Sequence, residues 1–359
     1  MSSSPLETAI DSRVGEVRFD ALDFSFGELA SLHGQKEIVI DPEYQRLFRW
    51  SNDQRSRLIE SVLLGLPLPQ IFLIENQDGI LELIDGLQRV SSVLQFLDHD
   101  LMGLEQLRLS GCDVISDLNG LTIDDLNLSL RLRLKRSPIR AVIIRKQSKG
   151  FLKYEMFKRL NTGGSALSAQ EVRNCSLRMI EGGANFYGWL QSLAAHPAFQ
   201  ETIATLSDTD RDQKADEELV VRYLALKNAR NEFKGSVRDW LDSFLEQVLL
   251  NQRHLDRELE EADFDRVFSF LRDTFGPDAF VKYRDDRPIG ALAPAFFEAV
   301  TMGTWENRDL LADADKNRVR ENIVRTLQTP EFKAQTGPGA NSKPKLDERI
   351  RLIAEAVRA

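Results

Sequence analysis

The chain has 359 residues, 42% of them hydrophobic, so it can bury a substantial core and is long enough for two domains. Its 56 acidic and 47 basic residues give a formal net charge of −9, which argues against nonspecific coating of DNA by the whole molecule but leaves room for a local basic face. The chain has two distant cysteines, so we expect a reducing compartment and no structural metal site. It has no apolar run of the roughly 18 residues that cross a membrane and no signal-peptide pattern, so we expect a cytoplasmic protein.

Strands and helices alternate in the first half of the chain, after a polar tail over residues 1–17. The patterns predict, in chain order, a strand over residues 36–41, a helix after Trp50, a β-hairpin over residues 70–84, a helix over residues 87–97 and a strand over residues 139–146. Ser51 and Gln54 have the spacing of a capping box, and Gly65 is expected to end that first helix. Leu87 falls on the apolar face of the helix over residues 87–97.

Long amphipathic helices replace the strand signals after about residue 180. Residues 333–348, rich in Gly, Pro, Ser and Lys, are expected to be a loose segment. We therefore predict the α+β class, with a mixed N-terminal domain over residues 18–180 and an all-α domain over residues 181–359.

The stretch "LIDGLQR", which joins the predicted hairpin to the next helix, is open to two interpretations. Asp85 is a favoured N-cap residue, and Gln88 would complete a capping box, so the junction can be a helix start and nothing more. Arg89, however, lies in the first turn, where the helix dipole disfavours a cation. Free N–H groups, a glycine that permits close approach and an arginine beside them suit a phosphate or another anion.

Two further stretches also allow both a structural and a functional interpretation. "EYQRLFRW" is an extended segment whose aromatic residues can pack in a core, or can stack on a base while the arginines neutralise phosphates. "NTGG" (161–164) can be a helix C-cap and connector, or a turn that offers backbone N–H groups to a ligand. No lysine follows these glycines, so the loop is not a Walker-type phosphate loop.

Residues 131–149 contain eight basic residues and no acidic one, beginning with Arg131, Arg133, Lys135 and Arg136. A solvated helix end and edge strand would explain them. The alternative is a groove for a phosphate backbone, which keeps DNA among the expected partners.

Four motifs follow one another in the order and approximate spacing of the GmrSD N-terminal-domain family, and the chain resembles that family over roughly residues 20–180. The motifs are "EYQRLFRW", "SVLLGLPLPQIFLIE", "ELIDGLQRVSSVLQFL" and "FKRLNTGGSALSAQEVRN". The resemblance implies a ParB/sulfiredoxin-like domain with a nucleotide pocket built around a D-G-x-Q-R signature. In family members associated with defence against phage DNA, this domain binds and hydrolyses nucleoside triphosphates and controls a nuclease on a second domain or a separate chain.

Carried onto this sequence, the resemblance implies a catalytic set and a nucleotide-binding set. The catalytic set is Asp85, Gln88 and Arg89, with Mg²⁺ as the expected companion of the nucleoside triphosphate. The nucleotide-binding set is Tyr44, Gln45, Arg46, Trp50, Gly86, Asn161, Thr162 and Gly163. Leu87 departs from the glutamine of the best-known signature. If that glutamine faced the ligand, hydrolysis could be impaired here, but the apolar register points Leu87 toward the core.

The four histidines, His33, His99, His196 and His254, are scattered, and no nuclease motif accompanies them. We therefore expect a nucleotide-binding, NTP-hydrolysing regulatory subunit of a DNA-targeting anti-phage defence or restriction system, acting with a separate nuclease subunit. Its DNA could include modified phage DNA, and the helical half has apolar faces that could support a homo-oligomer. The alternatives are a ParB-like DNA-binding adaptor that uses nucleotide as a switch without turnover, and a non-catalytic interaction module.

Overall fold

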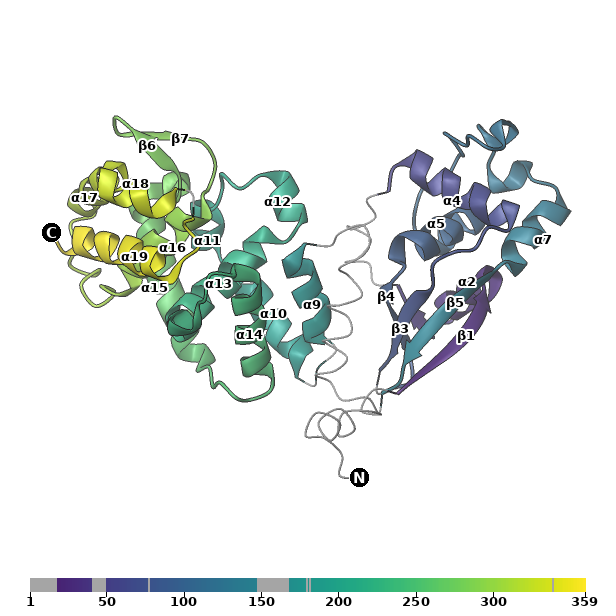
Figure 1. Ribbon diagram of the computed structural model, residues 1–359, viewed down its shortest axis with the longest axis horizontal. Helices are drawn as coiled ribbons and strands as arrows, with labels where there is room; N and C mark the ends of the chain where they lie inside the picture. Colours follow the sequence, from purple (N-terminus) through teal and green to yellow (C-terminus); the bar gives the residue numbers. More distant parts are fainter. Residues whose placement is uncertain are drawn as a thin grey trace, which may run out of the picture. The chain divides into compact units, whose positions relative to one another are not determined.

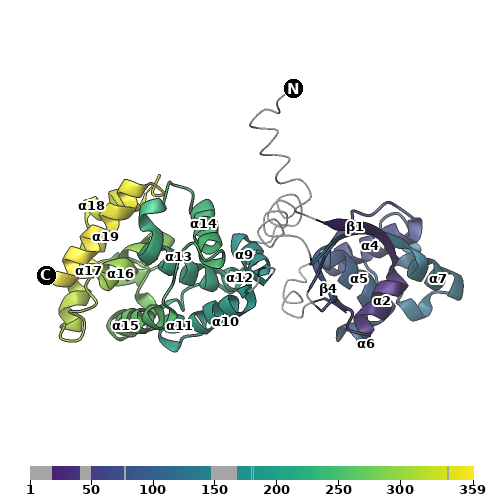
Figure 2. The same cartoon turned by 90° about the horizontal axis from the view of Figure 1, so that it is seen from below.

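The chain forms two compact units, Met1–Gly164 and Ser165–Ala359 (Figures 1 and 2). A computed structural model describes residues 18–40, 50–76, 78–146, 168–178, 180, 182–337 and 339–359, without the side chains of residues 175 and 178. None of the helices in these ranges combines the length and the apolar character that a membrane span requires.

The first unit is built on a five-stranded mixed sheet with the order β1-β5-β3-β4-β2. The strands are β1 (Phe19–Ser25), β2 (Ile38–Val39), β3 (Ile71–Glu75), β4 (Leu81–Asp85) and β5 (Pro138–Ile144). The pairs β1–β5 and β3–β4 are antiparallel, whereas β3–β5 and β2–β4 are parallel. The predicted hairpin is therefore confirmed as β3–β4, and β5 lies between β1 and β3.

Helices cover one face of this sheet. They are α2 (Phe26–Gly34), α4 (Asn52–Leu64), α5 (Leu87–Leu97), α6 (His99–Met102) and α7 (Leu128–Arg136). Alternate residues of β3 and β5, such as Leu73 and Ile143, join α2, α4 and α5 in one hydrophobic core. Phe72, Ile74 and Ile144 point to the other face and are buried as well, so the two central strands are buried on both sides.

Local signals account for the boundaries of α4. Ser51 and Gln54 form the predicted capping box, and Gly65 ends the helix with φ of 72°. The strand expected over residues 36–41 is shorter, at Ile38–Val39, and β1 and α2 were not anticipated.

The second unit is predominantly helical. Its helices are α9 (Ala169–Arg178), α10 (Gly183–Ala194), α11 (Pro197–Thr202), α12 (Asp208–Asp212), α13 (Ala215–Ala229), α14 (Val237–Leu249), α15 (Arg257–Phe275), α16 (Pro294–Trp305), α17 (Lys316–Gln328), α18 (Pro330–Thr336) and α19 (Lys343–Arg358). The core of this unit contains an aromatic cluster around Phe264 and Phe268. The α+β class is thus confirmed, but the unit also contains a β-hairpin, β6 (Lys282–Arg284) and β7 (Arg287–Ile289). The segment expected to be loose, 333–348, lies mostly in α18 and α19.

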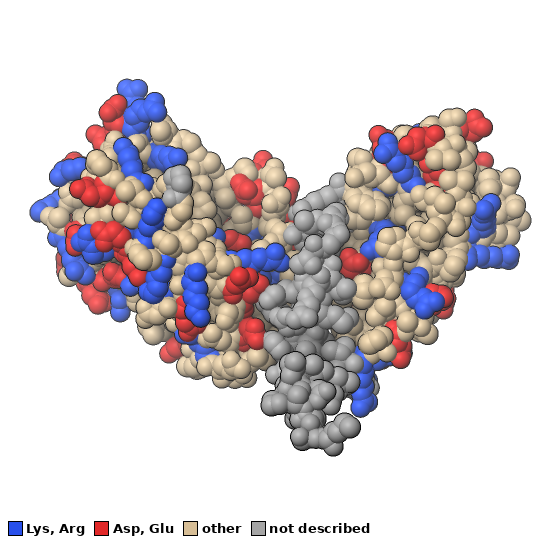
Figure 3. Space-filling model, in the orientation of Figure 1, with Lys and Arg blue, Asp and Glu red and all other residues tan. Residues whose placement is uncertain are grey.

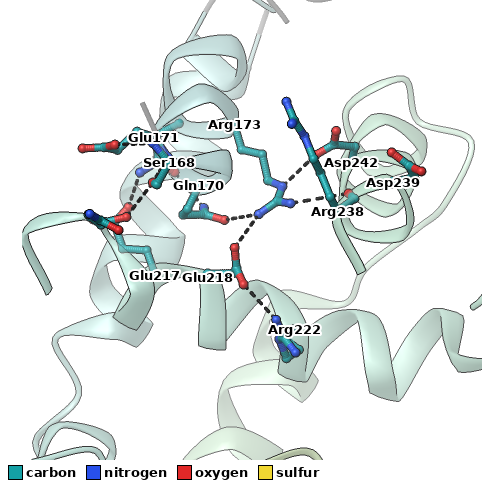
Figure 4. Close-up of polar contacts among 12 residues, drawn as sticks. Ser168, Gln170, Glu171, Arg173, Glu217, Glu218, Arg222, Arg238, Asp239 and Asp242 are labelled. Atoms are coloured by element: carbon teal, nitrogen blue, oxygen red, sulfur yellow. Dashed lines mark hydrogen bonds and ion pairs between the residues drawn. The ribbon is translucent and has the colours of Figure 1, made fainter. Parts of the chain in front are cut away.

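A line of buried and half-buried charges joins α9 to the rest of the second unit (Figure 4). Arg173 on α9 donates to Asp242 on α14 over 2.7 Å and to Glu218 on α13 over 3.0 Å. Glu218 also accepts from Arg222 over 2.8 Å, and Arg222 reaches Glu298 on α16. Glu298 in turn pairs with Arg349 on α19. Each of these charges has a partner of opposite sign, which offsets the cost of removing it from water.

We expected the domain boundary near residue 180. The compact units instead divide between Gly164 and Ser165, because α9 packs with α10, α13 and α14 of the helical unit.

Candidate nucleotide site at the β4–α5 junction

Gly86 separates β4 from α5 and lies in a conformation that other residues rarely adopt. Its φ is 96°, and a Cβ at this position would lie 2.4 Å from Ile71 Cγ2. Just before it, the β3–β4 register shifts, so that Leu83 and Asp85 have partners on β3 and Ile84 is passed over. Such a bulge changes the direction of the strand. Glycine and bulge together bring the start of α5 close to the end of β4.

The predicted capping box at this junction is wrong. The N-cap of α5 is Gly86, and no side chain caps the helix. Asp85 cannot serve because it is still paired with Phe72 in the sheet and its carboxylate binds Arg89. The first turn of α5 therefore keeps the positive end of its dipole without a capping side chain.

Arg89 is held by three acceptors. Its Nη2 donates to Asp85 Oδ2 over 2.8 Å, and its Nη1 donates to the backbone carbonyls of Pro69 and Gln70 over 2.5 and 2.8 Å. These contacts offset the unfavourable position of a cation in the first turn. Among the described residues, acceptors are found for three of the five N–H donors of the guanidinium group, and the other two could donate to a ligand oxygen.

The structure brings Trp50, from the upstream motif, to the same junction. The backbone N–H of Trp50 donates to Gln88 Oε1 over 3.2 Å. The carbonyl of Trp50 accepts from Arg55 Nε, and Arg55 Nη1 donates to Gln95 Oε1, both over 3.1 Å. Burial lowers the pKa of the Arg55 guanidinium, which still leaves it charged at neutral pH. Gln88 thus positions Trp50, through a contact that joins residues 38 positions apart.

Sequence reasoning missed Arg55 and Gln95. A signal was present for Gln95, because it lies seven residues after Gln88 and so on the same face of α5. Its Nε2 donates to the carbonyl of Glu105 over 2.8 Å, which ties the helix to the loop that follows α6.

Leu87 packs against the hydrophobic core, as its register predicted. The remaining residues implied by the resemblance, Tyr44, Gln45, Arg46, Asn161, Thr162 and Gly163, lie outside the described residues.

The basic stretch divides into two parts. Arg133, Lys135 and Arg136 are exposed in the last turn of α7 and have no ion pair with any described residue, and Figure 3 shows basic side chains over this helix. Arg131 is half-buried, and its Nε has no hydrogen-bond partner. On β5, by contrast, Arg140 and Arg145 pair with Asp23 and Asp20 of β1. Carboxylates of β1 thus neutralise the strand, and the cations of this stretch that have no ion pair with a described residue lie on α7.

Residues 28–178 match the family described as the GmrSD restriction endonuclease, N-terminal domain. This part of the chain is similar to the GmrSD N-terminal domain. The match begins in α2 and ends at the last residue of α9, so the matched region includes the whole β4–α5 junction and α7. Neither the curated proteins nor the solved structures include one that matches this chain.

Proposed function

We propose that this protein is a nucleotide-binding, NTP-hydrolysing regulatory subunit of a DNA-targeting restriction or anti-phage defence system, acting with a separate nuclease. The GmrSD N-terminal domain supports the restriction theme, because the family is named for a restriction endonuclease. One structural observation carries the nucleotide part of the proposal. An uncapped helix start, a glycine with no room for a Cβ and an arginine with two remaining donors meet at the β4–α5 junction.

Each residue of the junction has a proposed role. Phosphoryl transfer to water requires positioning and charge neutralisation more than covalent chemistry. The first-turn N–H groups of α5 and the remaining donors of Arg89 would hold phosphate oxygens. Asp85 would orient the attacking water, and Gln88 would act as a positioning residue through Trp50.

Mg²⁺ would enter this site together with the triphosphate. Among the described residues, no three His, Cys, Asp or Glu side chains lie together in a group that could hold a metal ion. Mg²⁺ commonly binds through one or two carboxylates plus substrate phosphates, and Asp85 can supply one such carboxylate. When bound, the ion would neutralise charge on the phosphate oxygens.

Phosphate release from each of the four ribonucleoside triphosphates with Mg²⁺ tests the proposal. We expect release by the parent protein, none by Arg89→Ala, and a reduced rate for Arg89→Lys, which keeps the charge but loses the planar fork. Arg140→Ala is the matched control, because Arg140 is an arginine of the same unit whose one ion pair among the described residues is with Asp23, away from the junction. Circular dichroism and a thermal melt establish that each variant is folded.

A titration with a fluorescent nucleotide separates the remaining outcomes. Binding without release of phosphate would contradict hydrolysis and select a nucleotide switch. Failure to bind any of the four nucleotides would contradict the proposed site as a whole.

The unpaired cations of α7 favour a second candidate, a ParB-like DNA-binding adaptor. No described carboxylate pairs with Arg133, Lys135 or Arg136. The phosphate oxygens of DNA would supply the missing partners. We expect Arg133→Gln/Lys135→Gln/Arg136→Gln to weaken binding of a short DNA duplex about tenfold or more at low salt. Unchanged binding of DNA would remove α7 from the proposal.

A further inference from the structure

The β6–β7 hairpin presents basic side chains on one of its two faces. The register pairs Lys282 with Ile289 and Arg284 with Arg287, and between them Tyr283 with Pro288. Because side chains alternate along a strand, Lys282, Arg284, Arg287 and Ile289 lie on the same face. All four are exposed, and the exposed fraction of Ile289 is 38%.

The other face attaches the hairpin to the helical unit. Tyr283 is buried, and its hydroxyl donates to the carbonyl of Asp278 over 2.8 Å. The backbone N–H of Asp285 donates to Gln328 Oε1 on α17 over 3.2 Å. The strands are therefore fixed on α17 while their basic face points to solvent, and Figure 1 shows the hairpin projecting beyond α17 and α18.

The three cations have no ion pair or hydrogen bond in the described part of the chain. Arg284 and Arg287 are moreover directly opposite each other across the two strands, where like charges destabilise a pair. An anion bound between the two guanidinium groups would reverse the sign of that interaction, because each can donate paired N–H groups to a phosphate.

Asp285 and Asp286 form the turn between the strands. Both have positive φ, 48° and 61°, which is the conformation of a tight two-residue hairpin turn with strong twist. Their carboxylates lie at the tip, where Figure 3 shows acidic beside basic side chains. An anionic partner is therefore expected to approach the face of the strands, away from the tip.

We propose that this basic face, defined as Lys282, Arg284 and Arg287, binds the phosphate backbone of duplex DNA. A two-stranded ribbon fits the wide major groove of B-form DNA, whereas the deep, narrow groove of duplex RNA does not admit one. The proposal concerns the helical unit and does not depend on the nucleotide site or on α7.

Binding of a short fluorescent DNA duplex to the full chain, followed by anisotropy across a salt series without nucleotide, tests this site. We expect Lys282→Gln/Arg284→Gln/Arg287→Gln to weaken binding about tenfold or more at low salt, and to make the slope of log K against log salt shallower by about 2 to 3. Asp285→Asn/Asp286→Asn keeps residues that tolerate positive φ and removes repulsion, so it should tighten binding.

The matched control removes three cations that do have carboxylate partners, two of them exposed and one, Lys343, half-buried. Arg266, Lys343 and Arg351 pair with Asp309, Asp347 and Glu355, and their combined change to Gln alters the net charge by the same amount. This control should bind DNA within about twofold of the parent, since no phosphate contact is lost.

Three results would overturn the proposal. The first is that the parent does not bind duplex DNA, and the second is that the hairpin variant and its control lose the same affinity for DNA. The third is a preference for duplex RNA that depends on the hairpin cations. A fluorescent-nucleotide titration of the hairpin variant keeps this outcome separate from the function proposed above, because nucleotide affinity should not change.

Discussion

Gly86 is subject to two constraints that can be separated by experiment. We expect Gly86→Ala to lower the free energy of unfolding by about 2 kcal/mol or more, because it combines an unfavourable φ with a steric contact against Ile71. Gly79→Ala is the matched control, since its φ is 84° but nothing lies within 4 Å of an added Cβ. It should cost about 1 kcal/mol. Urea unfolding measures the free energy of unfolding of both variants. Equal losses of stability in Gly86→Ala and Gly79→Ala would contradict the steric contribution of Ile71.

Cys112 should be unreactive in the folded protein. Burial, followed by the nearby carboxylate of Glu60, raises the pKa of its thiol to about 11. Only the thiolate is nucleophilic, so we expect slow alkylation at pH 8 in buffer and complete alkylation in denaturant. The Cys175→Ser variant leaves Cys112 as the one cysteine of the chain, so alkylation reports on this thiol alone. Rapid alkylation of the folded Cys175→Ser variant would contradict the prediction.

The contacts of Arg89 could not have been predicted from the sequence. Its position in the first turn of α5 was evident, and so was the penalty that the dipole imposes there. The compensating acceptors are two main-chain carbonyls some twenty residues earlier, which only the packing of β3 beside α5 brings into reach. The packing of α4 on α5 places Trp50 beside Gln88, and the expected cap is displaced because Asp85 pairs with Phe72 and binds Arg89.

At the scale of helices and strands, local chemistry was predictable where it acts within a few residues. The capping box of α4 and its glycine stop are examples, and so is the reciprocal pair of Ser168 and Glu171 at the start of α9. The β6–β7 hairpin was missed because each strand has three residues, too few to show alternation, and its turn uses two aspartates where Asn-Gly would be the recognisable signal.

Glu217 and Glu218 are neighbours on α13 with opposite pKa shifts. Burial raises the pKa of Glu217 above its ordinary value of 4.5 despite Lys214. For Glu218 burial acts in the same direction, but Arg222 and Arg173 outweigh it and lower the pKa. Ionised Glu218 therefore stabilises the folded state above pH 4.5, and this contribution is lost on acidification, whereas Glu217 disfavours folding as the pH rises above 4.5.

Urea unfolding as a function of pH tests this pair. Glu218→Gln should destabilise the protein by about 2 kcal/mol at pH 7, since the carboxylate is partly exposed and each arginine keeps a second partner. It should also weaken the loss of stability below pH 4.5. Glu217→Gln should instead weaken the loss of stability that sets in as the pH rises above 4.5. Parallel pH profiles in the two variants would contradict the assignment.

For the whole molecule, the two hydrophobic cores share no residue. We therefore expect two transitions in calorimetry of the full chain, one for each unit. A nucleoside triphosphate with Mg²⁺ at about 100 times its Kd should stabilise the unit that contains the β4–α5 junction by about 2.7 kcal/mol, and so raise one transition by about 5 °C or more. An equal shift of both transitions, or a shift of the helical unit alone, would place the nucleotide elsewhere.

The buried charges around Arg173 determine where this protein can be divided to build chimaeras. A cut at residue 180, the boundary that the change of sequence texture indicates, would leave α9 with one parent and Asp242 and Glu218 with the other. Unless the second parent supplied matching charges, Arg173 would lose both carboxylates and Asp242 would lose the guanidinium of Arg173, whereas Glu218 would keep Arg222. A cut before Ser168 transfers the whole set together, so exchanged halves should fold only when α9 travels with the helices that follow it.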